Sequence, residues 1–177
     1  GFTITNGFLD GSSNRGAGIR IAGGSPTIRH NRITGNASDG TSWNYGGGIA
    51  GEGSGANPRR AHHEVDDNEL RNGSWNYGAG IYVAAGAQAE IVGNTLRNNR
   101  NLTVASPSTG RGHGAAIYIA GTATVASNFM VGNRNDTTGW NYGGGIAIAD
   151  GIVALWNNTI ADNIVQGGSW RYGGGIY

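Results

Sequence analysis

Apolar residues recur along the chain in short groups that glycine and asparagine separate. A run of small residues ending in isoleucine occurs six times, at Ile19, Ile49, Ile81, Ile117, Ile146 and Ile176, and successive members lie 29 to 36 residues apart. Behind most of these isoleucines apolar and other residues alternate, as in Ile81-Tyr82-Val83, which is the period of a strand with one buried face. Gly51 is the exception in the inner column. The pattern predicts a short strand at the same place in each repeat.

A second block lies between these strands and reads apolar-x-x-Asn-x-apolar. Its five copies span Ile28 to Ile33, Val65 to Leu70, Ile91 to Leu96, Val125 to Met130 and Leu155 to Ile160. The spacing inside the block is constant while the loops around it change length. The chain is therefore a repeat with a period of about 30 residues.

Each repeat offers three strand-like pieces, and one such coil cannot bury its apolar side alone. The repeats must stack, with equivalent strands paired in parallel at ~4.8 Å. This predicts an all-β fold, a single-stranded β-solenoid with three parallel sheets and about six coils, continuous over residues 1–177. A helical solenoid is disfavoured because glycine triplets and β-branched residues are poor helix formers.

Stacking places the asparagines of successive repeats above one another. One predicted ladder comprises Asn31, Asn68, Asn94, Asn128 and Asn158, and a second comprises Asn36, Asn99, Asn133 and Asn163, with Gly73 where another asparagine would stand. An asparagine amide both donates and accepts hydrogen bonds and tolerates left-handed turns, so each can bond the coils above and below. We expect these residues to be structural.

The opening Gly1-Phe2-Thr3-Ile4-Thr5-Asn6-Gly7, the asparagine blocks and the Gly-Gly-Gly-Ile runs resemble the right-handed parallel β-helix repeat family with the pectate-lyase-like fold. The resemblance extends over essentially the whole chain. It implies a right-handed solenoid. It implies no single activity, because this fold hosts lyases, hydrolases, adhesins and structural surface proteins.

Aromatic residues precede four of the six isoleucine runs at constant spacing. They are Trp43, Tyr45, Trp75, Tyr77, Trp140, Tyr142, Trp170 and Tyr172, and Tyr82 and Tyr118 follow on the outer face of the next strand. One interpretation is a stacked ladder that covers a corner of the core. The other is a strip that binds a glycan or a protein partner, with the rings stacked on successive sugars.

Two short motifs resemble catalytic motifs of polygalacturonases, Asp66-Asp67 and Gly112-His113-Gly114. They lie about 46 residues apart, further than on neighbouring coils, and the other two motifs of that family are absent. His113 also falls in the tyrosine position of the repeat. No complete catalytic constellation is found, so a non-enzymatic role is favoured and enzymatic activity is left open.

A local cluster, His62, Glu64 and Asp66, would share one face of a strand and is a candidate metal site. In the stacked arrangement Glu64 would neighbour Glu90 and Thr27, and Asp66 would neighbour Arg29 and Val92. An ion pair of Arg29 with Asp66 explains half the cluster without a metal and is the favoured interpretation. No cofactor is expected.

Charge and composition limit the classes of partner that we expect the chain to bind. Only 13% of residues are charged, all 12 basic residues are arginine, and the net charge is +1, so we expect neither nucleic acid nor anionic lipid as a partner. No apolar stretch approaches the ~20 residues of a membrane span. Without cysteine, disulfides and thiolate metal sites are excluded.

Both ends fall inside a coil, so we expect their strand edges to be covered by copies of the chain in an end-to-end assembly or by flanking parts of a longer chain. Together these features predict an extracellular or cell-surface structural or adhesive solenoid that can polymerise into a filament or surface layer. The alternative is a module that binds or processes a polysaccharide.

Overall fold

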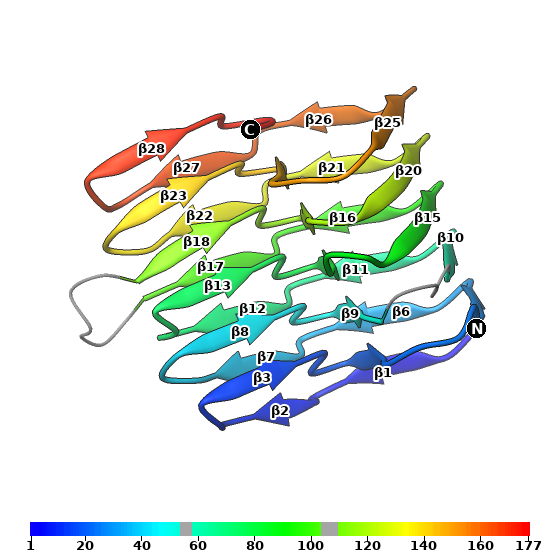
Figure 1. The fold of residues 1–177 in the computed structure, drawn as a ribbon, viewed down its shortest axis with the longest axis horizontal. Helices are drawn as coiled ribbons and strands as arrows, with labels where there is room; N and C mark the ends of the chain where they lie inside the picture. Colours follow the sequence, from blue (N-terminus) through cyan, green and yellow to red (C-terminus); the bar gives the residue numbers. More distant parts are fainter. Residues whose placement is uncertain (54–57, 104–109) are drawn as a thin grey trace.

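The computed structural model describes residues 1–53, 58–103 and 110–177. In this part of the chain all regular structure is β, in strands of two to five residues that follow one another around a coil. Figure 1 shows the coils lying one above another from the N-terminal to the C-terminal end. No helix long and apolar enough to cross a membrane occurs among the described residues.

Five parallel sheets run along the stack, and we name them A to E in the order in which the chain meets them. Sheet A contains β1 (Thr3–Thr5), β6 (Arg32–Thr34), β11 (Glu64–Asp66), β16 (Thr95–Arg97), β21 (Phe129–Val131) and β26 (Thr159–Ala161). Sheet B contains β2 (Phe8–Leu9), β7 (Ala37–Asp39), β12 (Glu69–Arg71), β17 (Arg100–Leu102), β22 (Arg134–Asp136) and β27 (Ile164–Gln166). Sheet C contains β3 (Ser13–Arg15), β8 (Trp43–Tyr45), β13 (Trp75–Tyr77), β18 (Arg111–His113), β23 (Trp140–Tyr142) and β28 (Trp170–Tyr172).

The last two sheets complete the coil. Sheet D contains β4 (Ile19–Ile21), β9 (Ile49–Gly51), β14 (Ile81–Val83), β19 (Ile117–Ile119) and β24 (Ile146–Ile148). Sheet E contains β5 (Thr27–Arg29), β10 (Arg59–Ala61), β15 (Gln88–Val92), β20 (Thr122–Ala126) and β25 (Val153–Trp156). Neighbouring strands pair in parallel and in register, for example Ile81 with Ile49 and Ile117. The predicted parallel β-solenoid is confirmed.

The coil has more corners than the sequence pattern predicts, five sheets instead of three and about five turns instead of six. The reason lies in the turns. A residue in the left-handed region separates sheets A and B in successive coils, as at Gly35, Asp67 and Asn98, with φ between 53° and 63°. Each such residue ends a strand after about three residues, because the left-handed region is incompatible with extended backbone.

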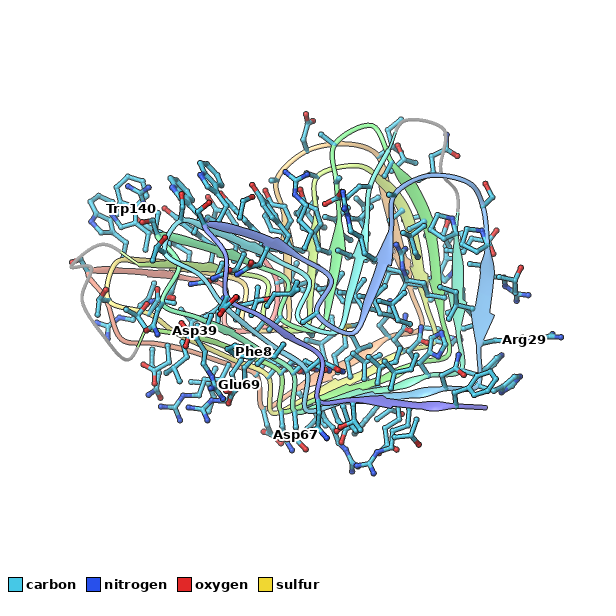
Figure 2. The ribbon with its side chains drawn as sticks, turned by 90° about the horizontal axis from the view of Figure 1, so that it is seen from below. Phe8, Arg29, Asp39, Asp67, Glu69 and Trp140 are labelled. Carbon is cyan, nitrogen blue, oxygen red and sulfur yellow. The ribbon has the colours of Figure 1, made fainter. Side chains whose placement is uncertain are left out.

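The coil encloses two interiors of different chemistry, which we call the aliphatic lobe and the amide lobe. Sheets A, D and E surround the aliphatic lobe, whose fully buried members include Ile33, Ile81 and Ile91. Sheets B and C face each other across the amide lobe, which buries asparagines such as Asn44 and Asn101. In Figure 2, which looks along the stack, the amide lobe carries Trp140 on one outer face and Phe8, Asp39 and Glu69 on the other.

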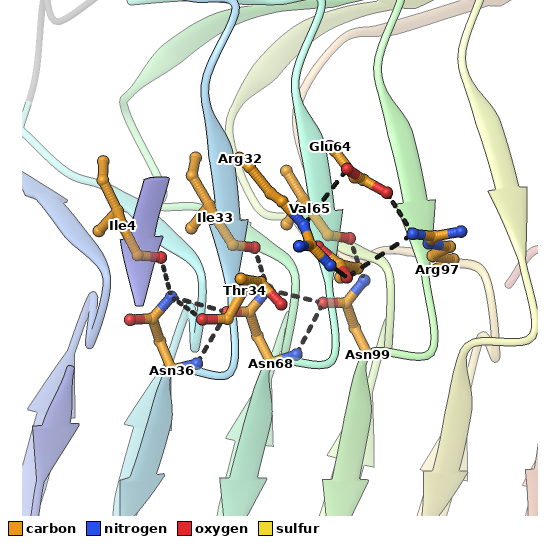
Figure 3. Close-up of polar contacts among 11 residues, drawn as sticks. Ile4, Arg32, Ile33, Thr34, Asn36, Glu64, Val65, Asn68, Arg97 and Asn99 are labelled. Carbon is orange, nitrogen blue, oxygen red and sulfur yellow. Dashed lines mark hydrogen bonds and ion pairs between the residues drawn. The ribbon is translucent and has the colours of Figure 1, made fainter. Parts of the chain in front are cut away.

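The asparagine ladders exist, but one member was assigned to the wrong ladder. Asn68 does not align with Asn31 and Asn94. It stands between Asn36 and Asn99, and its amide nitrogen donates to Asn99 Oδ1 at 3.0 Å while its Oδ1 accepts from Asn36 Nδ2 at 3.0 Å (Figure 3). The ladder is Asn36, Asn68, Asn99, Asn133 and Asn163, and Gly73 is not part of it.

His63 takes the position between Asn31 and Asn94 that was predicted for Asn68. Its Nδ1 accepts from the backbone of Asn31, its backbone donates to Asn94 Oδ1 at 2.9 Å, and its Nε2 lies 3.0 Å from the carbonyl of Ile28. Arg60 occupies the preceding apolar position, opposite Ile28 and Ile91. Because arginine and histidine replace the expected apolar residue and asparagine, the pattern is hidden in this coil.

Candidate functional site

The aromatic residues form three columns on the outer surface where sheet C meets sheet D. In sheet C, Trp and Tyr at the two ends of each Trp-Asn-Tyr strand point outward while the central asparagine points into the amide lobe, as alternation requires. The first column is Ser13, Trp43, Trp75, Arg111, Trp140 and Trp170, and the second is Arg15, Tyr45, Tyr77, His113, Tyr142 and Tyr172. The third, on sheet D, is Arg20, Ala50, Tyr82, Tyr118, Ala147 and Tyr177.

A tight turn holds the second and third columns close together. Gly46 begins this turn with φ 61°, and a Cβ there would lie 2.4 Å from the carbonyl oxygen of Ile49. Only glycine fits such a backbone. Consequently Tyr45 lies 4.8 Å from Tyr82 between ring centroids, and Tyr77 lies 4.6 Å from Tyr118.

In the second and third coils the rings of each sheet C column stack on one another. Trp43 and Trp75 have centroids 5.4 Å apart and planes within 6°, and Tyr45 and Tyr77 repeat this geometry at 5.4 Å and 11°. Their faces therefore contact neighbouring rings, and their edges meet solvent. This is the arrangement expected of a ladder that covers a corner, and a sugar would not find a free ring face between two stacked rings.

Burial in this corner raises the pKa of the tyrosine hydroxyls. It raises the pKa of Tyr118 to about 12, with a smaller contribution from nearby Tyr45, and it raises the pKa of Tyr77 and Tyr82 as well. The charged form is disfavoured because little water reaches these groups. The hydroxyls remain protonated and can donate hydrogen bonds at any physiological pH.

The columns are interrupted in the fourth coil, where Arg111-Gly112-His113 replaces Trp-Asn-Tyr. The guanidinium carbon of Arg111 lies 3.9 Å from the ring centroid of Trp75 and 4.6 Å from that of Trp140, so the cation takes the place of an indole ring. His113 lies between Tyr77 and Tyr142, with centroids 4.9 and 4.8 Å away. The prediction that His113 replaces a tyrosine in the ladder is confirmed.

The two motifs that resemble those of polygalacturonases lie on different sheets. His113 is on sheet C, and Asp66 is on sheet A, where its Oδ2 accepts a hydrogen bond from Arg32 at 2.9 Å. Burial, and secondarily the charge of Arg111, lowers the pKa of His113 to about 4. The structure thus keeps His113 neutral and apart from Asp66.

The candidate metal residues are also separated. His62 sits in a turn with φ 55° and stacks on His30, with centroids 5.2 Å apart. Glu64 and Asp66 remain on one face, where they pair with arginines (Figure 3). Among the described residues, no three side chains of His, Cys, Asp or Glu are grouped to hold a metal ion.

The expected pair of Arg29 with Asp66 was wrong. Arg32 and Arg97 pair with Asp66 instead, because the register of this coil differs by five residues from the predicted one. Glu64 accordingly neighbours Arg32 and Thr95, and not Thr27 and Glu90. The cluster consists of outer-face ion pairs.

Two features escaped the sequence analysis. A third asparagine column, Asn14, Asn44, Asn76 and Asn141, lies inside sheet C. Arg60 lies fully buried in the aliphatic lobe, where its three guanidinium nitrogens have no partner among the described residues. Gly51 was the one sequence feature that could have indicated this buried arginine, because a Cβ at Gly51 would lie 1.9 Å from the nearest guanidinium nitrogen of Arg60. Burial lowers the pKa of Arg60 to about 10.

Comparison with known proteins adds no relative. No protein-family model matches the chain, and no significant match was found among curated proteins or solved structures.

Proposed function

We propose that the chain is a structural β-solenoid, a stiff module of an extracellular or cell-surface protein that presents its aromatic face for adhesion. The observation that carries the proposal is the continuous asparagine ladder at the junction of the lobes. Each buried amide from Asn36 to Asn133 donates to the next asparagine at 2.9 to 3.0 Å. Every coil is thereby joined to the next by side chains as well as by backbone.

The surface chemistry supports a scaffold in preference to an enzyme. The motif residues His113 and Asp66 lie on different sheets, and Asp66 is occupied by ion pairs. Membership of the pectate-lyase-like β-helix family is part of the proposal, and it rests on the resemblance of the sequence repeat. Assembly with further copies or with flanking segments would extend the same ladders.

One experiment with two readouts tests this function. The protein is incubated with neutral and acidic polysaccharides, with and without calcium, while reducing ends and unsaturated products are measured. Native-state hydrogen exchange is followed in parallel. We expect no bond cleavage, and we expect the amides of the central coils to exchange only through global unfolding.

Either readout can overturn the proposal. Cleavage that disappears in His113→Gln or Asp66→Asn would make the chain an enzyme. Rapid exchange in the central coils, with each coil opening independently, would contradict a stiff scaffold. Asp39→Asn, a change on the opposite outer face of the amide lobe, is the matched control and should alter neither readout.

A further inference from the structure

The interrupted part of the aromatic face contains a hollow of about 430 Å³, within the range of roughly 300–1,000 Å³ typical of ligand pockets. Tyr118 contributes to it from sheet D, and Tyr177 contributes from the residue after the bridge of Ile176 with Ile146. His113 and Tyr142 contribute from sheet C. Trp75 and Trp140 also line it. The hollow therefore lies where the fourth and fifth coils depart from the repeat.

The hollow lies where the third column lacks one aromatic ring. Tyr82 and Tyr118 stack at 5.6 Å and 11°, and Tyr177 is the next ring of this column, but Ala147 stands between Tyr118 and Tyr177. Two strand spacings separate these tyrosines, about 10 Å. A ring placed halfway would lie ~5 Å from each, within the ~4.5–7 Å of favourable ring pairs. Ala147 itself is buried and does not line the hollow. The space that Tyr118 and Tyr177 border is lined instead by Ile148 and Ala149, and its volume is sufficient for one flat six-membered ring.

A polar group of the hollow is unsatisfied. The Nε2 atom of His113 is buried and has no hydrogen-bond partner among the described residues. Burial of such a group without a partner is costly, and buried polar atoms normally find a donor or an acceptor. The Nε2 atom of the neutral imidazole can accept a hydrogen bond from a hydroxyl or, in the other tautomer, donate one to it. The hollow therefore combines flat apolar walls with an unused hydrogen-bonding atom.

The column has a second gap, at Ala50, and the protein fills that one itself. Glu52 forms ion pairs with Arg15 and Arg20 at 3.2 Å each, and the guanidinium of Arg15 lies 5.2 Å from the ring centroid of Tyr45. Side chains from neighbouring coils thus occupy the surface around Ala50. The gap at Ala50 is therefore covered by charged side chains, whereas a hollow remains beside Ala147.

We propose that this hollow is a binding site for a single pyranose residue of a glycan, whose ring lies between Tyr118 and Tyr177 and whose hydroxyl bonds to Nε2 of His113. A pyranose fits both features, because its C–H faces pack on aromatic rings while its rim carries hydroxyls. A purely aromatic ligand would leave the histidine nitrogen unsatisfied. The site goes beyond the proposed structural function, and its absence would leave the scaffold unaffected.

The test places tyrosine, the residue found elsewhere in this column, at position 147. Ala147→Tyr should fold, because tyrosine already occupies this position at Tyr82 and Tyr118. Binding of the tetrasaccharides of glucose, N-acetylglucosamine and galacturonic acid is measured by calorimetry and by saturation-transfer NMR. We expect at least one to bind, and we expect Ala147→Tyr to weaken that binding at least tenfold.

Two further variants make the result specific. Ala50→Tyr fills the other gap and should leave binding unchanged. His113→Phe keeps a ring in the ladder, removes the nitrogen and should weaken binding severalfold. Failure of all three sugars to bind, equal binding by Ala147→Tyr, or binding of p-cresol without any sugar would overturn the proposal.

Discussion

The aliphatic lobe and the amide lobe belong to the same coils, yet different forces hold them together. In the aliphatic lobe, columns of Ile, Val and Leu pack without directional bonds, and burial of apolar surface stabilises them. In the amide lobe Asn44 donates to Asn76 Oδ1 at 2.9 Å and to the carbonyl of Arg71 at 3.0 Å, and it accepts from Asn14. Here the contacts depend on orientation.

This difference teaches how a repeat with such a small core keeps its coils aligned. Apolar columns tolerate exchange among residues of similar volume. A ladder of amides is satisfied only when each asparagine meets an asparagine or an equivalent group in the next coil. Burial of apolar surface therefore stabilises the aliphatic lobe, and the amides specify the register.

The largest effect should come from replacing an amide by an apolar residue of similar size. Asn44→Leu removes hydrogen bonds to Asn14, Asn76 and the Arg71 carbonyl and leaves the Asn76 oxygen without a donor among the described residues, so we expect a loss of about 3 kcal/mol, because an orphaned buried group costs ~1–3 kcal/mol. Urea denaturation gives the free energy of unfolding. The matched change in the aliphatic lobe, Ile117→Val, should cost only about 1 kcal/mol. Equal losses in the two variants would remove the distinction between the lobes.

The second prediction concerns the charged residue of the aliphatic lobe. Arg60→Leu replaces a buried guanidinium, which has no hydrogen-bond partner in the described part of the chain, by an apolar side chain like its neighbours in the column, Ile28 and Ile91. We expect the protein to gain about 2 kcal/mol, within the ~1–4 kcal/mol observed when buried ionic groups are replaced. Thermal and urea unfolding would show it. A large loss of stability would mean that this arginine forms a contact on which the fold depends.

The third prediction concerns the pH dependence of stability that His113 on sheet C contributes. Because the pKa of His113 falls from 6.5 to about 4 on folding, the unfolded chain binds a proton more readily, and stability declines as the pH falls from about 6.5 to about 4. Between pH 7 and pH 5 we expect a loss of about 2 kcal/mol from this residue. The difference between wild type and His113→Tyr, measured at both pH values, isolates this contribution from that of His63, whose pKa burial also lowers. A difference independent of pH would contradict the burial of His113.

The smallest effect should come from the outer surface of the aliphatic lobe. Arg59 and Glu90 pair at 3.3 Å, and both side chains are half exposed. Removal of this pair by Arg59→Ala should change the free energy of unfolding by less than about 1 kcal/mol, and less still in high salt. A larger change, determined by urea denaturation at low and high salt, would show that surface ion pairs also specify the register.

Much of this architecture follows from the sequence, because stacked coils place like residues over one another. The isoleucine column, the aromatic ladder and the role of His113 as a substitute for tyrosine were all predictable from spacing. The number of sheets was not predicted, and the ladder assignment failed in one coil. Val65-Asp66-Asp67-Asn68-Glu69-Leu70 matches the block that precedes sheet A, yet it belongs to the turn from sheet A to sheet B.

Physical similarity explains that failure. Both turns require a left-handed residue followed by a buried asparagine, so one sequence pattern fits either place. The true counterpart, Arg60 to Val65, has arginine and histidine where the pattern has an apolar residue and asparagine. Burial of an arginine inside an apolar column is costly, so a repeat pattern of apolar residues does not predict it. The hollow beside Ala147 was equally hidden, because it lies where the third column lacks an aromatic ring.

A crystal structure of the chain tests the central claim, that side-chain ladders specify the register, most directly. We expect Asn36, Asn68, Asn99, Asn133 and Asn163 in one hydrogen-bonded column and His63 between Asn31 and Asn94 in the other. Electron density that places Asn68 between Asn31 and Asn94 would contradict the account.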